Sequence, residues 1–205
     1  RVLKKYQPLL REHSALVVGN SRVELGIAPA HACFRGAGMQ LYNLGMPGAE
    51  VETQLAYALN LLYQQPVKTL PRDGDSALDR AMAGFRFTAA GEQNPDYYQS
   101  VLRDYFKSLF SLDALVASVR TIALQSDTSA DRDDAGFNPA RDFAEAVRIE
   151  GPHALFAQKM DNLTAKYNRP WYLRDSQGQL NPAFATLGHF LDIATARGVK
   201  VYLFT

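Results

Sequence analysis

The chain has 205 residues, of which 47% are hydrophobic and 21% charged, a composition typical of one globular domain with its own core. Its 22 basic and 21 acidic residues give a net charge of +1, so no basic excess indicates a nucleic-acid partner or a polybasic membrane patch. Cys33 is the single cysteine, which excludes an internal disulfide and a cysteine-based metal cluster.

The first predicted elements are a short amphipathic helix at 2–12 and a strand at 15–18. The strand is a short apolar run of the kind found in buried parallel sheets, and it stops at Gly19-Asn20-Ser21. Ligands of open α/β sheets collect at the carboxyl ends of strands, so the Ser21 hydroxyl stands where a substrate would arrive. The same tripeptide also fits an ordinary turn followed by a helix N-cap.

A second unit of the same kind follows. After one or two helical turns at 23–27, a strand is predicted at 39–44, then a glycine-rich turn at 45–49 and a helix at 50–64. Strand, glycine turn and helix therefore occur twice, which favours βαβ units and a parallel sheet. A short third strand is predicted at 67–70, where Pro71 interrupts it.

The second half of the chain is predicted to be mainly helical. Residues 96–125 carry two apolar stripes at helical spacing, and we expect the first, aromatic stripe to lie in the core. Residues 127–138 predict a solvated acidic loop, because their spacing differs from that of a calcium-binding loop. Helices are predicted at 139–148, 152–167 and 182–197, and a strand at 199–204. The aromatic stripe comprises Tyr98, Val101, Leu102, Tyr105, Phe106, Leu109 and Phe110, and the second stripe comprises Leu112, Leu115, Val116, Val119 and Ile122.

The two loops after the strands resemble those of the SGNH (GDSL-like) hydrolase superfamily. Gly19-Asn20-Ser21 stands where that family has Gly-Asp-Ser or Gly-Thr-Ser, and 22–29 look like its divergent, membrane-anchored branch from bacterial cell-surface polysaccharide clusters. Residues 43–49 resemble the second block of the family, whose glycine N–H helps to form the oxyanion hole. Residues 109–115 and the closing helix and strand are also similar to that branch.

The resemblance implies an α/β, three-layer flavodoxin-like sandwich with a parallel sheet, in a single domain over 1–205 with a helical insertion at about 76–170. It further implies a serine esterase or acyltransferase that acts on O-acyl groups, such as acetyl, of an extracytoplasmic polysaccharide. Ser21 would be the nucleophile, and the backbone N–H groups of Ser21 and Gly48 would hold the oxyanion. Asn20, Arg22 and Asn43 would bind substrate.

The general base is the open element of this mechanism. The Asp-x-x-His block of the family would follow the final strand, beyond Thr205, and no such block occurs in these residues. His31 and His153 are the alternatives within the chain, whereas His13 and His189 are expected to be structural. Arg22 could orient an anionic sugar or phosphate group, or instead pair with Glu24 or another carboxylate. No metal is expected, because no pair of histidines has ligand spacing.

The resemblance also implies an acylated glycan as partner, polysaccharide biosynthesis or export proteins as further partners, and no cofactor. No stretch approaches the ~20 apolar residues of a transmembrane helix. The resemblance further implies a domain of the periplasm or cell envelope, anchored by a helix that precedes Arg1. Because the chain begins at Arg1 rather than Met, we expect it to be an excerpt of a longer protein. Two alternatives to the esterase or acyltransferase function remain. One is a catalytically inactive SGNH-like domain that binds glycan or export proteins. The other is a phosphate-binding α/β domain, although the Gly-x-x-x-x-Gly-Lys motif is absent from the sequence.

Overall fold

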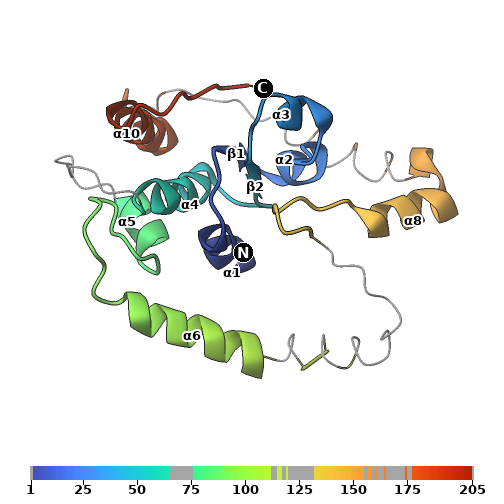
Figure 1. The fold of residues 1–205 in the computed structure, drawn as a ribbon, viewed down its shortest axis with the longest axis horizontal. Helices are drawn as coiled ribbons and strands as arrows, with labels where there is room; N and C mark the ends of the chain where they lie inside the picture. The colour runs from blue at the N-terminus through green and yellow to red at the C-terminus, as the bar shows by residue number, and fades with distance from the viewer. Residues whose placement is uncertain are drawn as a thin grey trace.

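A computed structural model describes residues 2–64, 76–111, 132–154 and 177–204, with isolated positions at 115, 116, 119, 157, 160, 164 and 174. Figure 1 shows the arrangement of its elements. In chain order they are α1 (Val2–Tyr6), the 3-10 helix η1 (Gln7–Leu10), β1 (Ala15–Gly19), α2 (Ser21–Gly26), α3 (Ala32–Gly36), β2 (Leu41–Gly45), α4 (Val51–Leu62), α5 (Ser76–Met82), α6 (Tyr97–Phe110), α8 (Arg141–Glu150) and α10 (Pro182–Ala196).

The sheet of the described residues consists of β1 and β2, which run parallel. Ala15 lies opposite Leu41 and Gly19 lies opposite Gly45, so the two strands end together. The crossover between them contains α2 and α3, as a parallel connection requires. The predicted mixed α/β class with a parallel strand pair is therefore confirmed. The third predicted strand, at 67–70, lies outside the described residues.

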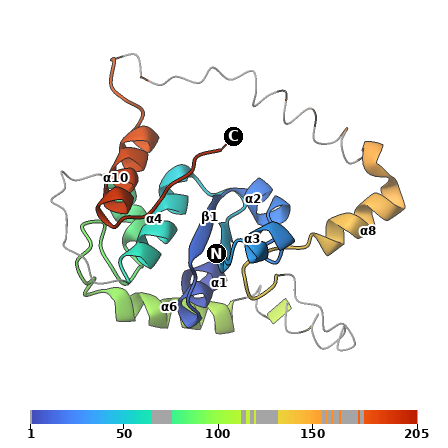
Figure 2. The same cartoon turned by 45° about the horizontal axis from the view of Figure 1, so that its top comes forward.

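Helices cover both faces of this small sheet. Val17 and Leu41 pack on one face against Val23, with Ile27 and Phe34 beside them. Figure 2 shows α2 and α3 on one side of the strands and α4 and α10 on the other. The side chains that alternate with the first set face the second side, where the cluster contains Leu16, Val18, Tyr42, Leu44, Ala58 and Phe190. Apolar side chains on both faces explain why these strands are continuous apolar runs.

A second core lies where α4, α5 and α10 meet. Leu59 and Tyr63 pack there against Leu78 and Met82, and Ile193 contributes from the end of α10. Helix α4 therefore buries one side on the sheet and another against α5 and α10. The helices predicted at 50–64, 139–148 and 182–197 are confirmed as α4, α8 and α10. The helix predicted at 152–167 begins at 152–154, and most of its remainder lies outside the described residues.

The expectation that the aromatic stripe of 96–110 lies in the core is wrong. Tyr98 and Phe110 are 78% and 76% exposed. The polar side of α6 faces the domain instead, because Asp104 Oδ2 accepts hydrogen bonds from Lys5 Nζ at 2.7 Å and from the Tyr6 hydroxyl at 2.9 Å. Of the second predicted stripe, Leu115, Val116 and Val119 are exposed, and the other members lie outside the described residues.

The acidic stretch predicted as a solvated loop is partly packed against the sheet. Ala135 accepts a hydrogen bond from the backbone N–H of Asn43 at 2.7 Å, so this segment covers the outer edge of β2. Asp133 Oδ1 holds the turn by accepting from the N–H groups of Ala135 at 3.0 Å and Phe137 at 2.8 Å. Asp133 and Asp134 are exposed, as predicted for a solvated loop, whereas Ala135 and Gly136 pack against β2, which local polarity does not reveal. Residues 127–131 lie outside the described part of the chain.

The prediction of a closing strand at 199–204 is also wrong. The structure describes all of these residues, and they form no hydrogen-bonded ladder. Tyr202 is 80% exposed, and its neighbours Val201, Leu203 and Phe204 are also exposed. Gly198 ends α10 with a φ of +67°, as predicted for a helix stop. A β-rich run becomes a strand only when another strand supplies hydrogen-bonding partners, which a sequence pattern does not reveal.

We predict that Gly45→Ala destabilises the fold. A Cβ at this position would overlap the backbone nitrogen of Glu24 and lie 2.7 Å from its Cα, and backbone atoms cannot move aside as a flexible side chain can. The free energy of unfolding should fall by about 1–3 kcal/mol, as measured by urea denaturation.

Gly26→Ala is the matched control, since nothing lies within 4 Å of the added Cβ at the end of α2. An equal loss of stability in both variants would contradict the close packing of α2 on the end of β2.

Candidate functional site

The two loops singled out in the sequence meet at the carboxyl edge of the strand pair. Gly19 and Gly45 are register partners at the ends of β1 and β2. The backbone N–H of Met46 donates to the Gly19 carbonyl at 2.8 Å, which joins the two loops directly. Segments 19–21 and 45–49, far apart in sequence, therefore lie beside each other.

Ser21 is the first residue of α2, directly after the turn that ends β1. The cap of this helix is supplied by Asn20, whose Oδ1 accepts from the backbone N–H of Arg22 at 2.9 Å. The N-cap interpretation of the tripeptide is thus correct for Asn20, which is exposed. Since a neighbouring side chain makes the cap, the half-buried Ser21 hydroxyl is not used for it.

Gly48 lies in the turn after β2. Its φ is +61°, in the left-handed region that favours glycine, and the turn is closed by a hydrogen bond from Ala49 N–H to the Met46 carbonyl at 3.3 Å. No atom lies within 4 Å of the place that a Cβ would occupy. Gly48 is exposed, so a ligand could come close to its backbone.

Asn43 was expected to bind substrate, and the structure gives it a different role. Its side chain is fully buried, and Nδ2 donates to the carbonyls of Val23 at 2.8 Å and Ile27 at 2.7 Å. Oδ1 accepts from the Gly45 N–H at 2.8 Å. Both ends of the amide are therefore engaged within the protein, and Asn43 positions α2 over the end of β2 instead of facing a ligand.

A buried ionic cluster beneath α2 was not anticipated from the sequence. Glu24 is 1% exposed, and its Oε1 lies 2.7 Å from Arg132 Nε and 3.5 Å from Lys4 Nζ. Lys4 Nζ also donates to the carbonyls of Asn43 at 2.9 Å and Gly136 at 2.6 Å. Helical spacing alone places Lys4 among the polar positions of the first helix, so no sequence signal indicates its burial.

Arg22 extends from the same turn as Ser21 and is exposed. The expected alternative of an ion pair with Glu24 is wrong, whereas an ion pair of Arg22 with another carboxylate stays a prediction. The Glu24 carboxylate is buried and is engaged by Arg132 and Lys4. Of the substrate-binding residues expected from the resemblance, Asn20 and Arg22 are exposed at the carboxyl edge and Asn43 is not.

No histidine of the described residues is hydrogen-bonded to Ser21. His13 precedes β1, so the length of a five-residue strand, about 16 Å, separates it from the carboxyl edge. Its ring packs 4.9 Å from that of Tyr42, and burial lowers its pKa. His31 caps α3, with Nδ1 accepting from Cys33 N–H at 3.3 Å, and His153 is exposed. The Nε2 atom of His189 is buried on α10.

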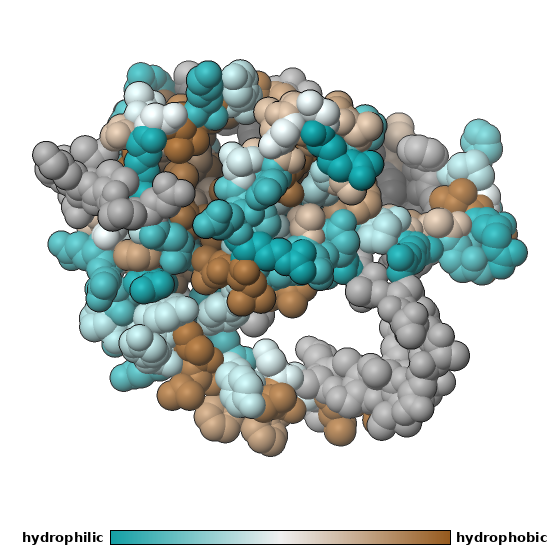
Figure 3. Space-filling view, viewed as in Figure 1, coloured by the Kyte–Doolittle hydropathy of each residue, from teal (hydrophilic) through white to brown (hydrophobic). Residues whose placement is uncertain are grey.

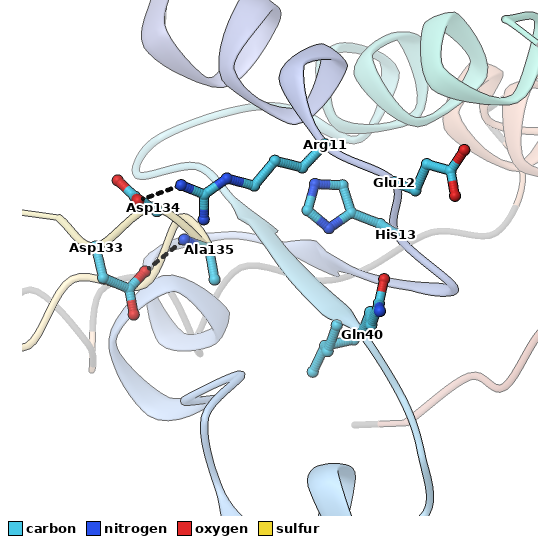
Figure 4. A pocket seen from close by; sticks show the side chains of 8 residues that line it. Arg11, Glu12, His13, Gln40, Asp133, Asp134 and Ala135 are labelled. Carbon is cyan, nitrogen blue, oxygen red and sulfur yellow. Dashed lines mark hydrogen bonds and ion pairs between the residues drawn. The ribbon is translucent and has the colours of Figure 1, made fainter.

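A hollow of about 800 Å³ lies at the opposite edge of the strands (Figure 4). It is an open hollow crossed by an exposed ion pair between Arg11 and Asp134 at 2.7 Å. It shares no residue with the carboxyl edge. Its lining residues are Arg11, Glu12, His13, Gln40, Leu41, Asp133, Asp134 and Ala135.

Among the residues that the structure describes, no three potential ligands of the types His, Cys, Asp and Glu come together as a metal site. Of the helices that the structure describes, none has the length and apolar character needed to cross a bilayer.

Comparison with protein-family models, with curated proteins and with solved structures gives no match. The case for a function therefore depends on the residues at the carboxyl edge.

We predict that the stability of the protein depends on Lys4 in a pH-dependent way. Burial lowers the pKa of Lys4 to about 8, against the opposing effect of Glu24. Above pH 8 the folded protein releases this proton while the unfolded chain keeps it to about pH 10.5, so Lys4 makes stability rise with pH in that window. Between about pH 7.5 and 9.5 the gain should be about 1–2 kcal/mol.

Urea denaturation at the two pH values tests this, with Lys4→Met as the comparison. The variant should be less stable at neutral pH, because Glu24 loses one cationic partner, and it should lose the rise with pH. Arg11→Ala, which breaks the exposed pair with Asp134, should keep the rise. If stability still rose between these two pH values in Lys4→Met, the effect could not be assigned to Lys4.

Proposed function

We propose that this protein is a serine esterase or O-acyltransferase of the SGNH type. The observation that carries the proposal is the position of Ser21 and Gly48 on adjacent loops at the carboxyl edge, joined through the hydrogen bond from Met46 to Gly19. A nucleophile and its oxyanion donors must lie within a few ångströms of one reacting carbonyl, which residues on two adjacent loops can achieve. Gly19-Asn20-Ser21 and the Gly48 turn also carry the sequence resemblance.

In the proposed reaction, Ser21 Oγ attacks the carbonyl carbon of an ester while a base takes the hydroxyl proton. The oxygen of the tetrahedral intermediate accepts hydrogen bonds from the backbone N–H groups of Ser21 and Gly48, each worth about 3 kcal/mol in the transition state. Collapse breaks the bond to the sugar oxygen, which leaves with the proton. Water or a second hydroxyl group then attacks the acyl-serine and regenerates Ser21.

The proposed substrate is an O-acylated, for example O-acetylated, polysaccharide outside the cytoplasm. Asn20 and Arg22 are exposed beside Ser21, and the Arg22 guanidinium could pair with a carboxylate or phosphate group of such a glycan. Polysaccharide biosynthesis or export proteins are proposed partners. The periplasmic location and the anchoring helix before Arg1 are part of the same proposal and come from the resemblance.

We also propose that the β1–β2 pair belongs to a larger three-layer sandwich within one domain. Helices on both faces of the pair support this, since parallel sheets are covered on both sides. The outer edge of β2 is occupied by the segment around Ala135, so the sheet would continue from β1, with the predicted strand at 67–70 as one contributor. The long stretch at 76–170 would be an insertion.

Reaction with a fluorophosphonate tests the nucleophile. Intact-mass analysis should show one adduct, because an activated serine attacks phosphorus and keeps the phosphonyl group. Ser21→Ala should abolish the adduct. Ser108→Ala, which removes an exposed serine of α6, should leave it unchanged.

A folded protein with its natural C-terminus that gives no adduct would contradict the serine mechanism. That result would favour the alternative of an inactive SGNH-like domain that binds glycan.

The role of Gly48 is tested by a pair of glycine variants. Gly48 and Gly38 have φ values of +61° and +69°, and nothing lies within 4 Å of a Cβ added to either. Alanine at the two positions therefore causes similar strain without overlap. Gly48→Ala should slow adduct formation by about 10- to 100-fold by crowding the oxyanion, less than the loss of an oxyanion-hole donor, because alanine keeps the backbone N–H. Gly38→Ala should react at the unaltered rate, and equal slowing in both would contradict the role of Gly48.

A further inference from the structure

Helix α6 is attached to the domain by its polar side. Ser100 is buried and donates to the Gly84 carbonyl at 3.1 Å, while Lys5 Nζ lies 3.3 Å from its Oγ. One turn further, Asp104 is bound by Lys5 and Tyr6. Hydrogen bonds from these two residues lower the pKa of Asp104 although burial alone would raise it. These contacts fix which side of the helix faces outward.

The outward side of α6 is a continuous apolar face. Its six large apolar side chains are each between 52% and 78% exposed. At 3.6 residues per turn they fall within an arc of about 140°, interrupted only by Gln99. Figure 3 shows hydrophobic side chains gathered along the lower rim of the molecule, over α6. The six residues, which we call the α6 face, are Tyr98, Leu102, Tyr105, Phe106, Leu109 and Phe110.

The composition and charge around the α6 face favour a lipid surface as its occupant. Four of the six side chains are aromatic, a type that is favoured where one end meets hydrocarbon and the other meets water. The exposed charged residues along the helix, Arg103 and Lys107, are both cationic, lie one turn apart and border the face beside Phe110. Within the helix the one acidic side chain, Asp104, is held by Lys5, and the exposed Asp96 precedes the first turn as the N-cap. An apolar, aromatic face bordered by cations matches the anionic headgroups and upper acyl chains of a bilayer.

Helix α8, which also exposes large apolar side chains, provides a contrast. Phe143, Val147 and Ile149 are exposed there, but Glu145 and Glu150 lie on the same short helix and Glu145 pairs with Arg148 at 2.6 Å. Mixed charges of this kind give no attraction to an anionic surface. Of these two helices, α6 is therefore the one whose charges complement an anionic surface.

We propose that α6 is an interfacial membrane-binding helix, which inserts the α6 face into an anionic bilayer while its polar side stays attached to the domain. The helix lies parallel to the membrane plane, with Arg103 and Lys107 at the phosphate level. This contact is made by the chain itself and is separate from any preceding anchor. It is also independent of the proposed esterase activity.

Sedimentation with vesicles tests this proposal, using phosphatidylcholine alone or mixed with phosphatidylglycerol. The protein should bind the mixed vesicles more tightly, and Phe106→Ser/Phe110→Ser should weaken that binding about tenfold or more. Arg103→Gln/Lys107→Gln should remove the preference for phosphatidylglycerol. Both pairs are exposed, so circular dichroism should show an unaltered fold. The matched control, Phe143→Ser/Val147→Ser in α8, has the same spacing of four residues and should bind as the unaltered protein does.

Two results would overturn the proposal. One is equal binding of all these variants to the mixed vesicles, or no binding by the unaltered protein. The other is a concentration-dependent dimer in light scattering that Phe106→Ser/Phe110→Ser abolishes, because the α6 face would then join two copies of the chain.

Discussion

The buried amide of Asn43 is the contact on which the carboxyl edge depends. It donates to carbonyls at the end of α2 and accepts from Gly45, so one side chain fixes the helix that begins with Ser21 over the end of β2. A close approach of backbone to backbone is needed for this, and glycine at position 45 permits it. With α2 fixed in this way and Met46 bound to Gly19, the loops of Ser21 and Gly48 are placed next to each other.

The ionic cluster beneath α2 extends this constraint to distant parts of the chain. Lys4, Glu24 and Arg132 come from α1, α2 and the segment that covers the edge of β2. Burying such charges is costly, so clusters of this kind contribute little net stability compared with apolar packing. Their directional hydrogen bonds do fix one arrangement, and removing one partner leaves the others buried and incompletely paired. We infer that this cluster positions the site more than it stabilises the fold.

The elements predicted correctly are those whose signal is local. β1 and β2 are apolar runs ended by glycine, and α4 and α10 have periodic apolar positions with clear start and stop residues. The adjacency of the Ser21 and Gly48 loops also follows from the βαβ pattern, because parallel strands end at the same edge. Asn20 as a helix cap was among the alternatives that the tripeptide left open.

The errors concern contacts between residues far apart in sequence. The orientation of α6 is set by Lys5 and Asp104, which are 99 positions apart, and no periodicity within the helix reveals which side such a pair will hold. Amphipathic spacing predicts an apolar face correctly but not that it points away from the core. Asn43 was expected to face substrate because a polar residue near a strand end is ambiguous until its partners, the carbonyls of α2, are known. The burial of Lys4 was not predicted for the same reason, because it depends on contacts with residues far away in the sequence.

The measurement that tests the central claim most directly is a crystal structure of the protein after reaction with a fluorophosphonate. We expect phosphorus bonded to Ser21 Oγ, with the phosphonyl oxygen about 2.7–3.1 Å from the backbone nitrogens of both Ser21 and Gly48. A phosphonyl oxygen directed away from Gly48, or a modified residue elsewhere in the chain, would contradict it.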